Sequence, residues 1–202
     1  MCIRDRACGL YSKDIVASKS YLGKHGKARI FIDDAGNDCK ITKPLIVVEG
    51  WDVTTLLNPE TKYSSEDFEN FKRSVSESTE LLPLIDGNPN IPNDQEYDLI
   101  FVNWDHGMDY IQRNALVVEE VIKWVNQQKA LSGSTEKNVI IGQSMGGVVS
   151  RYALRDMEQR NLTHQVRLFV SHDAPQQGAN IPLSIQYMYR NARNQLIKAP
   201  LY

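Results

Sequence analysis

The residues best suited to chemistry lie in segment 142–147, which reads Gly-Gln-Ser-Met-Gly-Gly. Ser144 stands between Gly142 and Gly146, which is the G-x-S-x-G spacing of a serine nucleophile. The segment follows the apolar run 139–141 and precedes residues typical of a helix, so it falls in a strand-to-helix turn. A turn of this kind holds the serine in a strained backbone conformation and lifts its hydroxyl above the sheet edge. We therefore predict that Ser144 is a nucleophile.

A glycine-rich turn at the start of a helix can instead serve a phosphate site. A P-loop would need Lys and then Ser or Thr after the glycines, and segment 142–147 has neither that pair nor G-x-G-x-x-G spacing. For a nucleophile, side chains at positions 142 and 146 would collide, and Gly147 permits close packing of the helix. The helix N-terminus also places its dipole and free N–H groups behind the serine. The nucleophile interpretation is therefore preferred.

The elements that must position this serine alternate between strands and helices. Short apolar runs of the kind buried on both faces of a parallel sheet predict four strands, at residues 45–48, 97–102, 138–141 and 166–170. Helices are predicted at residues 65–82, from residue 109 onwards, and at residues 145–159. This alternation indicates an α/β fold with a mostly parallel sheet flanked by helices.

Further features of the fold are predicted from local patterns. Residues 28–32 and 39–43, on either side of the turn cluster 33–38, predict an N-terminal β-hairpin. The second helix is predicted to begin at Asp109, with Gln112 completing a capping box. Prolines and a glycine predict a loop at residues 83–94. Apolar residues recur along the second helix in steps of three and four and form one face: Ile111, Ala115, Val118, Ile122 and Val125.

Composition excludes several classes of protein. The 202 residues amount to one domain, or one domain with an appendage, at about 150 residues per domain. The 23 Lys and Arg are balanced by 25 Asp and Glu, without the basic stripe of a nucleic-acid-binding protein. No run of apolar residues is long enough for a membrane span. The odd number of cysteines (Cys2, Cys8 and Cys39) indicates no disulfide framework.

The two ends of the sequence affect how the domain is delimited. Residues 1–6 resemble the translation of a sequencing adapter, so residues 1–27 are interpreted as an artefactual N-terminus followed by a poorly defined lead-in. Residues 28–202 are predicted to form a partial catalytic domain. No compartment is predicted, since the natural N-terminus is expected to be missing, and a secreted or cell-envelope location stays open.

Three segments resemble the α/β-hydrolase superfamily on its lipase and esterase side. Residues 142–154 resemble the nucleophile elbow and its helix, and residues 45–52 resemble the oxyanion strand and loop. Residues 170–179, with Pro175 and Gly178, resemble the turn of triacylglycerol-lipase-like and GPI-inositol-deacylase-like members. The resemblance implies the α/β-hydrolase fold and hydrolysis of carboxylic esters, lipid or acyl esters above all, through an acyl-enzyme on Ser144. It implies no cofactor and no metal.

The resemblance also assigns an oxyanion hole. Its donors would be the backbone N–H of Met145, which follows the nucleophile, and that of Trp51. Each is significant, because removing one such donor costs about 2.7–4 kcal/mol of transition-state stabilisation. The family usually has His-Gly where this chain has Glu49 and Gly50. A carboxylate aimed into the hole would oppose the oxyanion, so we expect Glu49 to point away. Loop packing is the alternative role for Trp51.

The catalytic base and acid are harder to place. A nucleophilic serine needs a general base and an orienting acid, which follow it in this superfamily in the order acid, then histidine. His164 precedes a predicted strand and therefore lies at the wrong sheet edge. His172 lies at the correct edge, although the family's histidine comes later in the chain. His106 precedes the nucleophile, and Asp173 is a candidate acid or a turn cap.

We therefore expect the catalytic histidine, and the acid unless it is Asp173, to lie beyond Tyr202. Alone, this chain should hydrolyse p-nitrophenyl esters weakly or not at all. Residues 181–202 carry apolar and basic side chains and form either a lid over an acyl pocket or a sheet-covering helix.

Other functions stay open from the sequence. A non-catalytic hydrolase-like module for binding or scaffolding would fit Glu49 and the missing histidine. Amide or thioester hydrolysis would use the same residues. Asp105, His106 and Asp109 could be metal ligands, although Asp109 fits a helix N-cap better. The expected partner is a small-molecule or lipid ester, without nucleic acid, and no oligomeric state is predicted.

Overall fold

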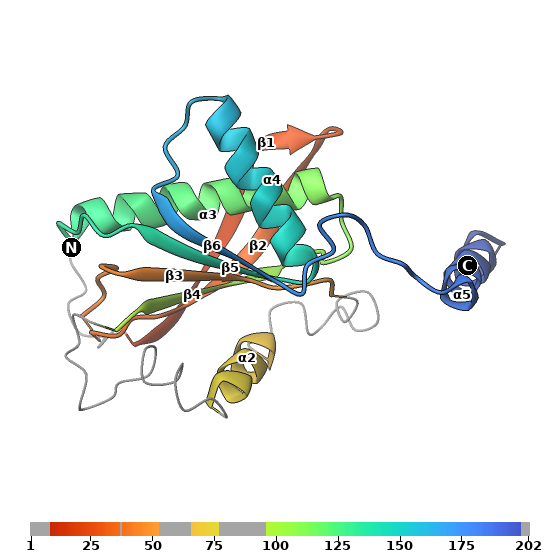
Figure 1. The fold of residues 1–202 in the computed structure, drawn as a ribbon, viewed down its shortest axis with the longest axis horizontal. Coiled ribbons are helices and arrows are strands. Elements are labelled where there is room, and N and C mark those ends of the chain that lie inside the picture. Colours follow the sequence, from red (N-terminus) through yellow and green to blue (C-terminus); the bar gives the residue numbers. More distant parts are fainter. Residues whose placement is uncertain (1–8, 37, 53–65, 77–95, 199–202) are drawn as a thin grey trace.

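A computed structural model describes residues 9–36, 38–52, 66–76 and 96–198, which form one mixed sheet with flanking helices (Figure 1). The strand order across the sheet is β1-β2-β4-β3-β5-β6. The pairs β3–β4, β3–β5 and β5–β6 are parallel, whereas β2 is antiparallel to both β1 and β4. The elements are β1 (Leu10–Tyr21), β2 (Lys24–Asp33), β3 (Pro44–Val48), α2 (Glu66–Ser76), β4 (Asp98–Trp104), α3 (Ile111–Leu131), β5 (Asn138–Gln143), α4 (Met145–Gln159), β6 (Val166–His172) and α5 (Leu183–Lys198).

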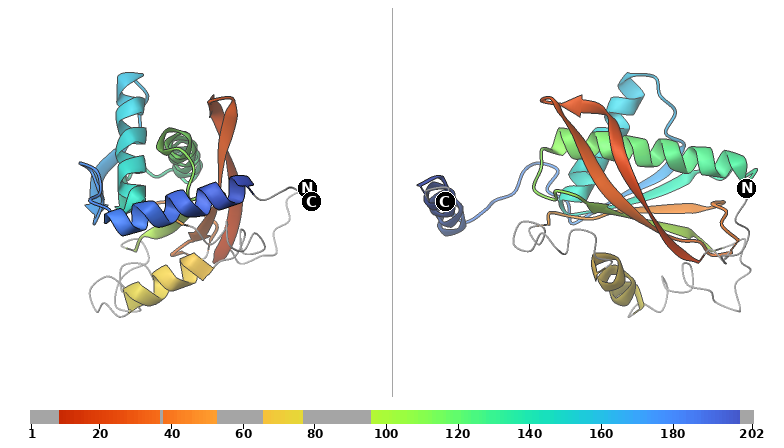
Figure 2. Two further views of the ribbon diagram at one scale, coloured as in Figure 1. Left: turned by 90° about the vertical axis from the view of Figure 1, so that its right-hand side faces the viewer. Right: turned by 180° about the vertical axis from the view of Figure 1, so that it is seen from behind.

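The predicted fold class is confirmed, as are the four predicted strands, each lengthened by one or two residues. The central strands of the sheet lie between two layers (Figures 1 and 2), whereas the edge strands β1 and β6 are largely exposed. Helices α3 and α4 cover one face and share its larger apolar cluster, while α2 covers the other face through Phe68, which contacts Phe31 and Phe101. Every residue of β4 is buried, as expected for a central strand covered on both faces.

The N-terminal hairpin is present but its strands were predicted wrongly. Residues 28–32 lie in β2, whose hairpin partner is β1 rather than residues 39–43. Leu22 and Gly23 join β1 to β2 with φ of 49° and 73°, and positive φ at both positions suits the twist of a two-residue hairpin. The described sheet thus begins at Leu10, within the range expected to lie ahead of the domain.

Side-chain hydrogen bonds explain why residues 39–43 are not a strand. The Asp34 carboxylate accepts the backbone N–H of Asp38 and of Cys39, at 3.1 and 3.2 Å. The Asp98 carboxylate accepts the N–H of Thr42 and of Lys43, at 2.6 and 2.9 Å. Backbone donors bound to carboxylates are not available to a strand ladder. Cys39 is also disulfide-bonded, which the odd cysteine count did not predict.

The apolar face of α3 is confirmed, but its start differs from the prediction. Ala115, Val118, Ile122 and Val125 are fully buried, and Ile111 packs at the edge of the same cluster. The helix begins at Ile111, and its N-cap Tyr110 makes no side-chain cap bond. Asp109 is not the N-cap because its carboxylate accepts the Tyr110 N–H at 2.8 Å and pairs with Arg113.

The remaining predictions concern helices α2 and α5 and the predicted loop at residues 83–94. Helix α2 ends at Ser76, and the rest of the helix predicted at residues 65–82 lies outside the described residues, as does the predicted loop 83–94. Helix α5 extends away from the sheet (Figures 1 and 2), and its exposed apolar side chains include Leu183 and Met188. Among the described residues, no helix combines the length and apolar character needed to cross a membrane.

Candidate active site

Ser144 lies in a sharp turn between β5 and α4, with φ of 49° and ψ of −121°. This conformation costs a non-glycine residue about 1–3 kcal/mol and persists only where the surroundings impose it. Here two backbone hydrogen bonds hold it. The Ser144 N–H donates to the carbonyl of His172 at 2.9 Å, and the Ser144 carbonyl accepts the N–H of Gly147 at 3.1 Å. The side chain is exposed at the carboxyl edge of the sheet.

Glycine is required around Ser144 because neighbouring backbone approaches too closely for a side chain. A Cβ on Gly142 would lie 2.4 Å from the Cα of Gly147. A Cβ on Gly146 would lie 2.3 Å from the carbonyl oxygen of Glu49. A Cβ on Gly147 would lie 2.5 Å from the Cβ of Ala174. The glycines therefore let the start of α4 pack directly on the end of β3 and on the segment after β6.

The loop that follows β3 passes beside the serine. A Cβ on Gly50 would lie 3.2 Å from the Cβ of Ser144 and 3.8 Å from its Oγ. Trp51 follows with 47% of its surface exposed. Met145 is the first residue of α4, where backbone N–H groups lack partners within the helix. The structure thus brings the loop and the helix start to Ser144, and the use of the Trp51 and Met145 N–H groups as oxyanion donors stays a prediction.

Glu49 is buried and bound to β4. Its Oε1 accepts the backbone N–H of Trp104 at 2.8 Å, and the Trp104 indole Nε1–H donates to the Glu49 carbonyl at 3.2 Å. Burial raises the pKa of this carboxyl well above its ordinary value, and the negative charges of Asp67 and Asp52 raise it further. A carboxyl that is hydrogen-bonded to β4 and whose pKa is raised opposes an oxyanion less than a free carboxylate would. No hydrogen bond connects it to Ser144 in the described part of the chain.

Sequence reasoning missed the role of Trp104. The side chain is fully buried at the end of β4, two residues beyond the predicted strand. Its two hydrogen bonds tie the first residue of the oxyanion loop to the central strand of the sheet. The available sequence signal was a tryptophan close to the end of an apolar run. Only the pairing of β3 with β4 shows that its indole meets Glu49.

The candidate base and acid residues are placed as follows. His172 ends β6 and Asp173 follows it, both exposed and at the same sheet edge as Ser144. Asp173 has a φ of 47°. His164 precedes β6 at the opposite edge, and its Nδ1 accepts the N–H of Val166 at 2.9 Å. Over the described ranges, no histidine side chain is hydrogen-bonded to Ser144.

His106 and its acidic neighbours do not form a metal site. The His106 ring is 69% exposed, and its Nε2 lies 3.9 Å from Oδ2 of Asp105. Although burial opposes it, hydrogen bonding to Arg113 and to the Tyr110 N–H lowers the pKa of Asp109. The Asp109 carboxylate is thus occupied by its ion pair with Arg113. Within the ranges that the structure describes, no three His, Cys, Asp or Glu side chains are arranged to hold a metal ion.

A cavity of about 310 Å³ adjoins the oxyanion loop. Gly50, Trp51 and Gln143 form the side next to Ser144, and Phe71 and Phe101 form an apolar side. The acidic residues Glu49, Asp52 and Asp67 also line it.

Comparison with solved structures gives weak likenesses only. Esterase Est22 has a TM-score of 0.46 at 11% identity, over 81% of this chain and 43% of that one. Est1E from Butyrivibrio proteoclasticus scores 0.44 at 10% identity, over 78% and 48%. The esterase of Pyrobaculum calidifontis scores 0.45 at 14% identity, over 79% and 43%. This chain therefore spans about half the length of these esterases. No curated protein matches the sequence.

A family model gives the assignment. The model described as PGAP1-like alpha/beta domain matches residues 85–199, which is more than half of the chain. The matched range runs from β4 to α5 and includes the turn that carries Ser144. With the strand order of the sheet and the geometry of that turn, the match shows that the chain belongs to the PGAP1-like alpha/beta domain family, within the α/β-hydrolase superfamily.

Proposed function

We propose that this domain is a serine hydrolase that cleaves carboxylic esters, lipid or acyl esters in particular, through an acyl-enzyme on Ser144. The observation that carries the proposal is the backbone of Ser144, held at φ 49° and ψ −121° with its side chain exposed. Strain of this size at an exposed serine has no structural use here, because a glycine would adopt the same turn at lower cost. The strain is explained if the hydroxyl itself is needed.

The reaction would proceed in two steps. A general base takes the Oγ proton as Ser144 attacks the ester carbonyl, and the resulting oxyanion accepts the N–H groups of Met145 and Trp51. Collapse of this intermediate expels the alcohol and leaves the acyl group on the serine. Water, activated by the same base, then attacks the acyl-enzyme and releases the acid. Both steps develop charge at one carbonyl oxygen, so the same two donors would serve both.

The identities of the general base and of the orienting acid are also part of the proposal. We assign the base to a histidine outside the described residues, since none that is described bonds to Ser144. Asp173 is kept as the candidate acid because it follows β6 at the correct sheet edge. The apolar side chains at the start of α5 and just before it (Ile181, Leu183, Ile185) support a lid over an acyl chain.

Fluorophosphonate labelling of the full-length natural protein tests this function. A fluorophosphonate is expected to modify Ser144, identified by mass spectrometry of the tryptic peptide, and to leave the Ser144→Ala variant unlabelled. Ser171→Ala is the matched control, since Ser171 is exposed nearby and bonds only to Gln176 in the described residues. Robust labelling should persist in that control.

A binding or scaffolding module is the second candidate. It is favoured by the lack of a histidine side chain hydrogen-bonded to Ser144 over the described ranges. In that case the full-length protein would resist the fluorophosphonate, and Ser144→Ala would change neither labelling nor ester turnover.

A further inference from the structure

The exposed apolar side chains of this domain gather on one side of the molecule. Fifteen large apolar side chains are exposed in the described residues, and nine of them lie at the carboxyl edge that carries Ser144 or in the segment 181–188 that leaves it. Four project from the hairpin tip and from the loops after β3 and β4, namely Leu22, Trp51, Met108 and Tyr110. Single exposed apolar residues are ordinary, but a group on one face indicates a surface for a partner or a membrane.

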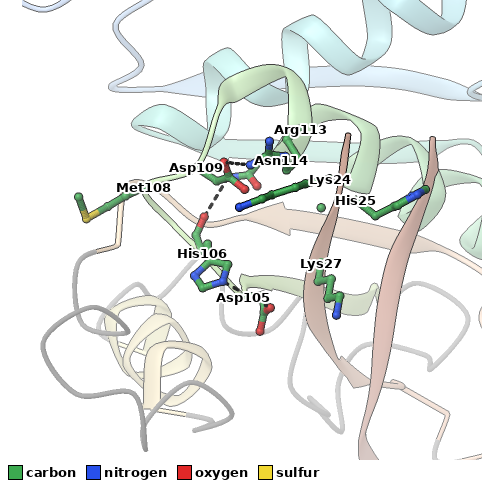
Figure 3. Close-up of a pocket in the computed structure, with 10 residues that line it drawn as sticks. Lys24, His25, Lys27, Asp105, His106, Met108, Asp109, Arg113 and Asn114 are labelled. Carbon is green, nitrogen blue, oxygen red and sulfur yellow. Dashed lines mark hydrogen bonds and ion pairs between the residues drawn. The ribbon is translucent and has the colours of Figure 1, made fainter. Parts of the chain in front are cut away.

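Strand pairing brings the hairpin tip to this edge. Strand β2 is antiparallel to β4, with Ala28 opposite Trp104, so the tip at Leu22 lies beyond the carboxyl end of β4. A cavity of about 690 Å³ opens between the tip and the loop that joins β4 to α3, and Lys24 reaches from the hairpin toward the loop (Figure 3). The Met108 side chain points away from the other side chains labelled in Figure 3. The hairpin tip and this loop therefore both present apolar groups to the outside of the same edge.

Helix α5 adds an apolar stripe to this side of the molecule. The helix stands apart from the sheet, on the side where the parallel strands end (Figures 1 and 2). Ile185 and Met188 are 40% and 59% exposed. In the sequence, apolar residue types recur at positions 185, 188, 189, 192 and 196, a spacing that places them on one face of a helix. Leu183 and Tyr187, also exposed, extend the apolar surface around the first turns.

The opposite face of α5 is basic. Positions 190, 194 and 198, which are four residues apart, are occupied by Arg, Asn and Lys. From residue 174 to residue 202 the sequence contains Arg190, Arg193 and Lys198 but neither Asp nor Glu. A helix with an apolar stripe and a basic opposite face is suited to lie in the plane of a membrane surface, with its cations at anionic headgroups.

Acidic side chains at the same edge oppose this positive charge only in part. Glu49 and Asp105 are buried, and Asp52 is half-buried. Asp109 is neutralised by an ion pair. Among the described residues, Asp173 is thus the exposed acid at this edge, against the cations of α5 and of the hairpin tip. The exposed charge on this side of the molecule is mainly positive.

A lipid surface fits these features better than a protein partner does. The apolar side chains come from a hairpin tip, two loops and a separate helix, and a bilayer is broad enough to receive all of them. Trp51, Tyr110 and Tyr187 are of the aromatic types enriched where a membrane meets water. We propose that the carboxyl edge of the sheet docks on a membrane that contains anionic lipid, with α5 lying in the interface and Leu22, Trp51 and Met108 inserted beside it.

Docking in this orientation brings the lipid to Ser144. Trp51 belongs to the loop that passes beside the serine, so its insertion places that loop at the bilayer surface. The substrate class that follows is an ester of a membrane lipid, taken directly from the bilayer. This substrate class rests on the proposed function, whereas the docking itself does not.

Vesicle binding tests the docking, with the chain carrying Ser144→Ala so that no lipid is hydrolysed. This chain should sediment with vesicles of phosphatidylcholine and phosphatidylserine, and much less with phosphatidylcholine alone. Lys24→Gln/Arg190→Gln should weaken binding to the anionic vesicles about 25-fold, because each cation near an anionic surface contributes about fivefold. The control Lys13→Gln/Lys137→Gln should bind as before. It removes the same charge from exposed lysines near the far end of β1 from the hairpin tip and just before β5.

The apolar contribution is tested on α5. Ile185→Ser/Met188→Ser should weaken vesicle binding at least about tenfold, because less apolar surface enters the bilayer. Leu10→Ser/Leu131→Ser is the matched control, since these side chains are 53% and 76% exposed at the opposite edge of the sheet, and it should bind as before. Equal weakening by both pairs, or equal binding to vesicles with and without phosphatidylserine, would overturn the docking. Loss of a dimer in Ile185→Ser/Met188→Ser, seen by sedimentation velocity, would assign the stripe to a second copy instead and would also overturn it.

Tryptophan fluorescence tests the orientation. At saturating lipid, phosphatidylcholine brominated on its acyl chain and mixed with phosphatidylserine should quench the emission of the chain. Trp51→Phe should remove most of this quenching, and Trp124→Phe should retain it, because Trp104 is fully buried and Trp124 packs at the edge of the core. Quenching that is the same in Trp51→Phe and wild type would overturn the orientation.

The same comparison on the full-length natural protein separates a membrane from a covering segment of the protein. The difference between wild type and Trp51→Phe should persist there, and its disappearance would assign this edge to another part of the protein and overturn the proposal. None of these measurements needs turnover. Failure of the proposed function appears separately, as a Ser144 that is not labelled by the fluorophosphonate.

Discussion

Replacing Glu49 by Gln should stabilise the domain at neutral pH. The Glu49 carboxyl is 5% exposed, and burial raises its pKa well above the ordinary value, with Asp67 and Asp52 adding to the effect. The folded chain therefore keeps a proton that the unfolded chain releases. Above the ordinary carboxyl pKa, folding must recapture this proton, and stability falls by about 1.4 kcal/mol per pH unit until the folded-state pKa is reached.

Glutamine removes this penalty and keeps the main contact. Its amide oxygen can accept the Trp104 N–H that Glu49 Oε1 accepts at 2.8 Å. The Glu49→Gln variant and the wild type should therefore differ least in stability at pH 4.5, close to the ordinary pKa of a glutamate, where the unfolded chain has released only about half of this proton. Their difference should then grow in favour of glutamine by up to about 1.4 kcal/mol for each pH unit, until the pH reaches the folded-state pKa of Glu49.

Urea unfolding at pH 4.5, 5.5, 6.5 and 7.5 measures this difference directly. Taking the difference between variant and wild type cancels other raised carboxyls, such as Glu119, which both chains share. Glu69→Gln on α2 is the control, because that side chain is exposed and its stability difference should not change with pH. A difference between Glu49→Gln and wild type that stays constant over this range would refute the reasoning, since Glu49 would then be ionised in the fold.

Three further variants test contacts within the domain. Gly146→Ala should cost about 1–3 kcal/mol in urea unfolding, because its Cβ would meet backbone oxygen 2.3 Å away. Arg160→Ala should cost about 3–5 kcal/mol at pH 7, because Glu119, 1% exposed, loses its cationic partner. Trp104→Phe should lower the thermal midpoint by a few degrees, because the indole bond to Glu49, worth about 1 kcal/mol, is lost.

Each variant has a matched control in the same chain. Gly133→Ala introduces a side chain at positive φ with nothing within 4 Å, so it carries backbone strain without a clash. Arg155→Ala removes an arginine of α4 whose side chain is 68% exposed, and should cost under about 1 kcal/mol. Trp124→Phe removes an indole that packs at the edge of the core. If the control variants lost as much stability as Gly146→Ala, Arg160→Ala and Trp104→Phe, the packing arguments would be contradicted.

Much of the catalytic edge could be predicted because its signals are local. A strand run, two glycines around Ser144 and a helical pattern specify a sharp turn, whichever other elements pack on it. The face of α3 was likewise readable from residues three and four apart, since the period of a helix places them on one side. The contribution of the Gly50 segment came from resemblance to a family rather than from its own residues.

The surroundings of the site depended on side-chain hydrogen bonds, some local and some between distant residues, that the pattern of residue types does not show. The hairpin partner of β2 was predicted wrongly. Residues 39–43 have the residue types of a strand, but backbone N–H groups in and next to this segment donate to the carboxylates of Asp34 and Asp98. The start of α3 was misassigned because Arg113 holds Asp109. In both cases a side chain takes a hydrogen-bonding group that the prediction had assigned to another partner. The pattern of residue types along the chain does not show this competition.

By itself the sequence determined the alternation of strands and helices, the position of the turn at Ser144 and the need for glycine on either side. Tertiary structure decided which strands are neighbours, and with them the burial of Glu49 against Trp104 and the cavity between the hairpin and the β4–α3 loop. The physical reason is range. Backbone conformation and periodicity act over a few residues, whereas desolvation, pKa and cavity shape depend on whatever atoms the sheet brings together.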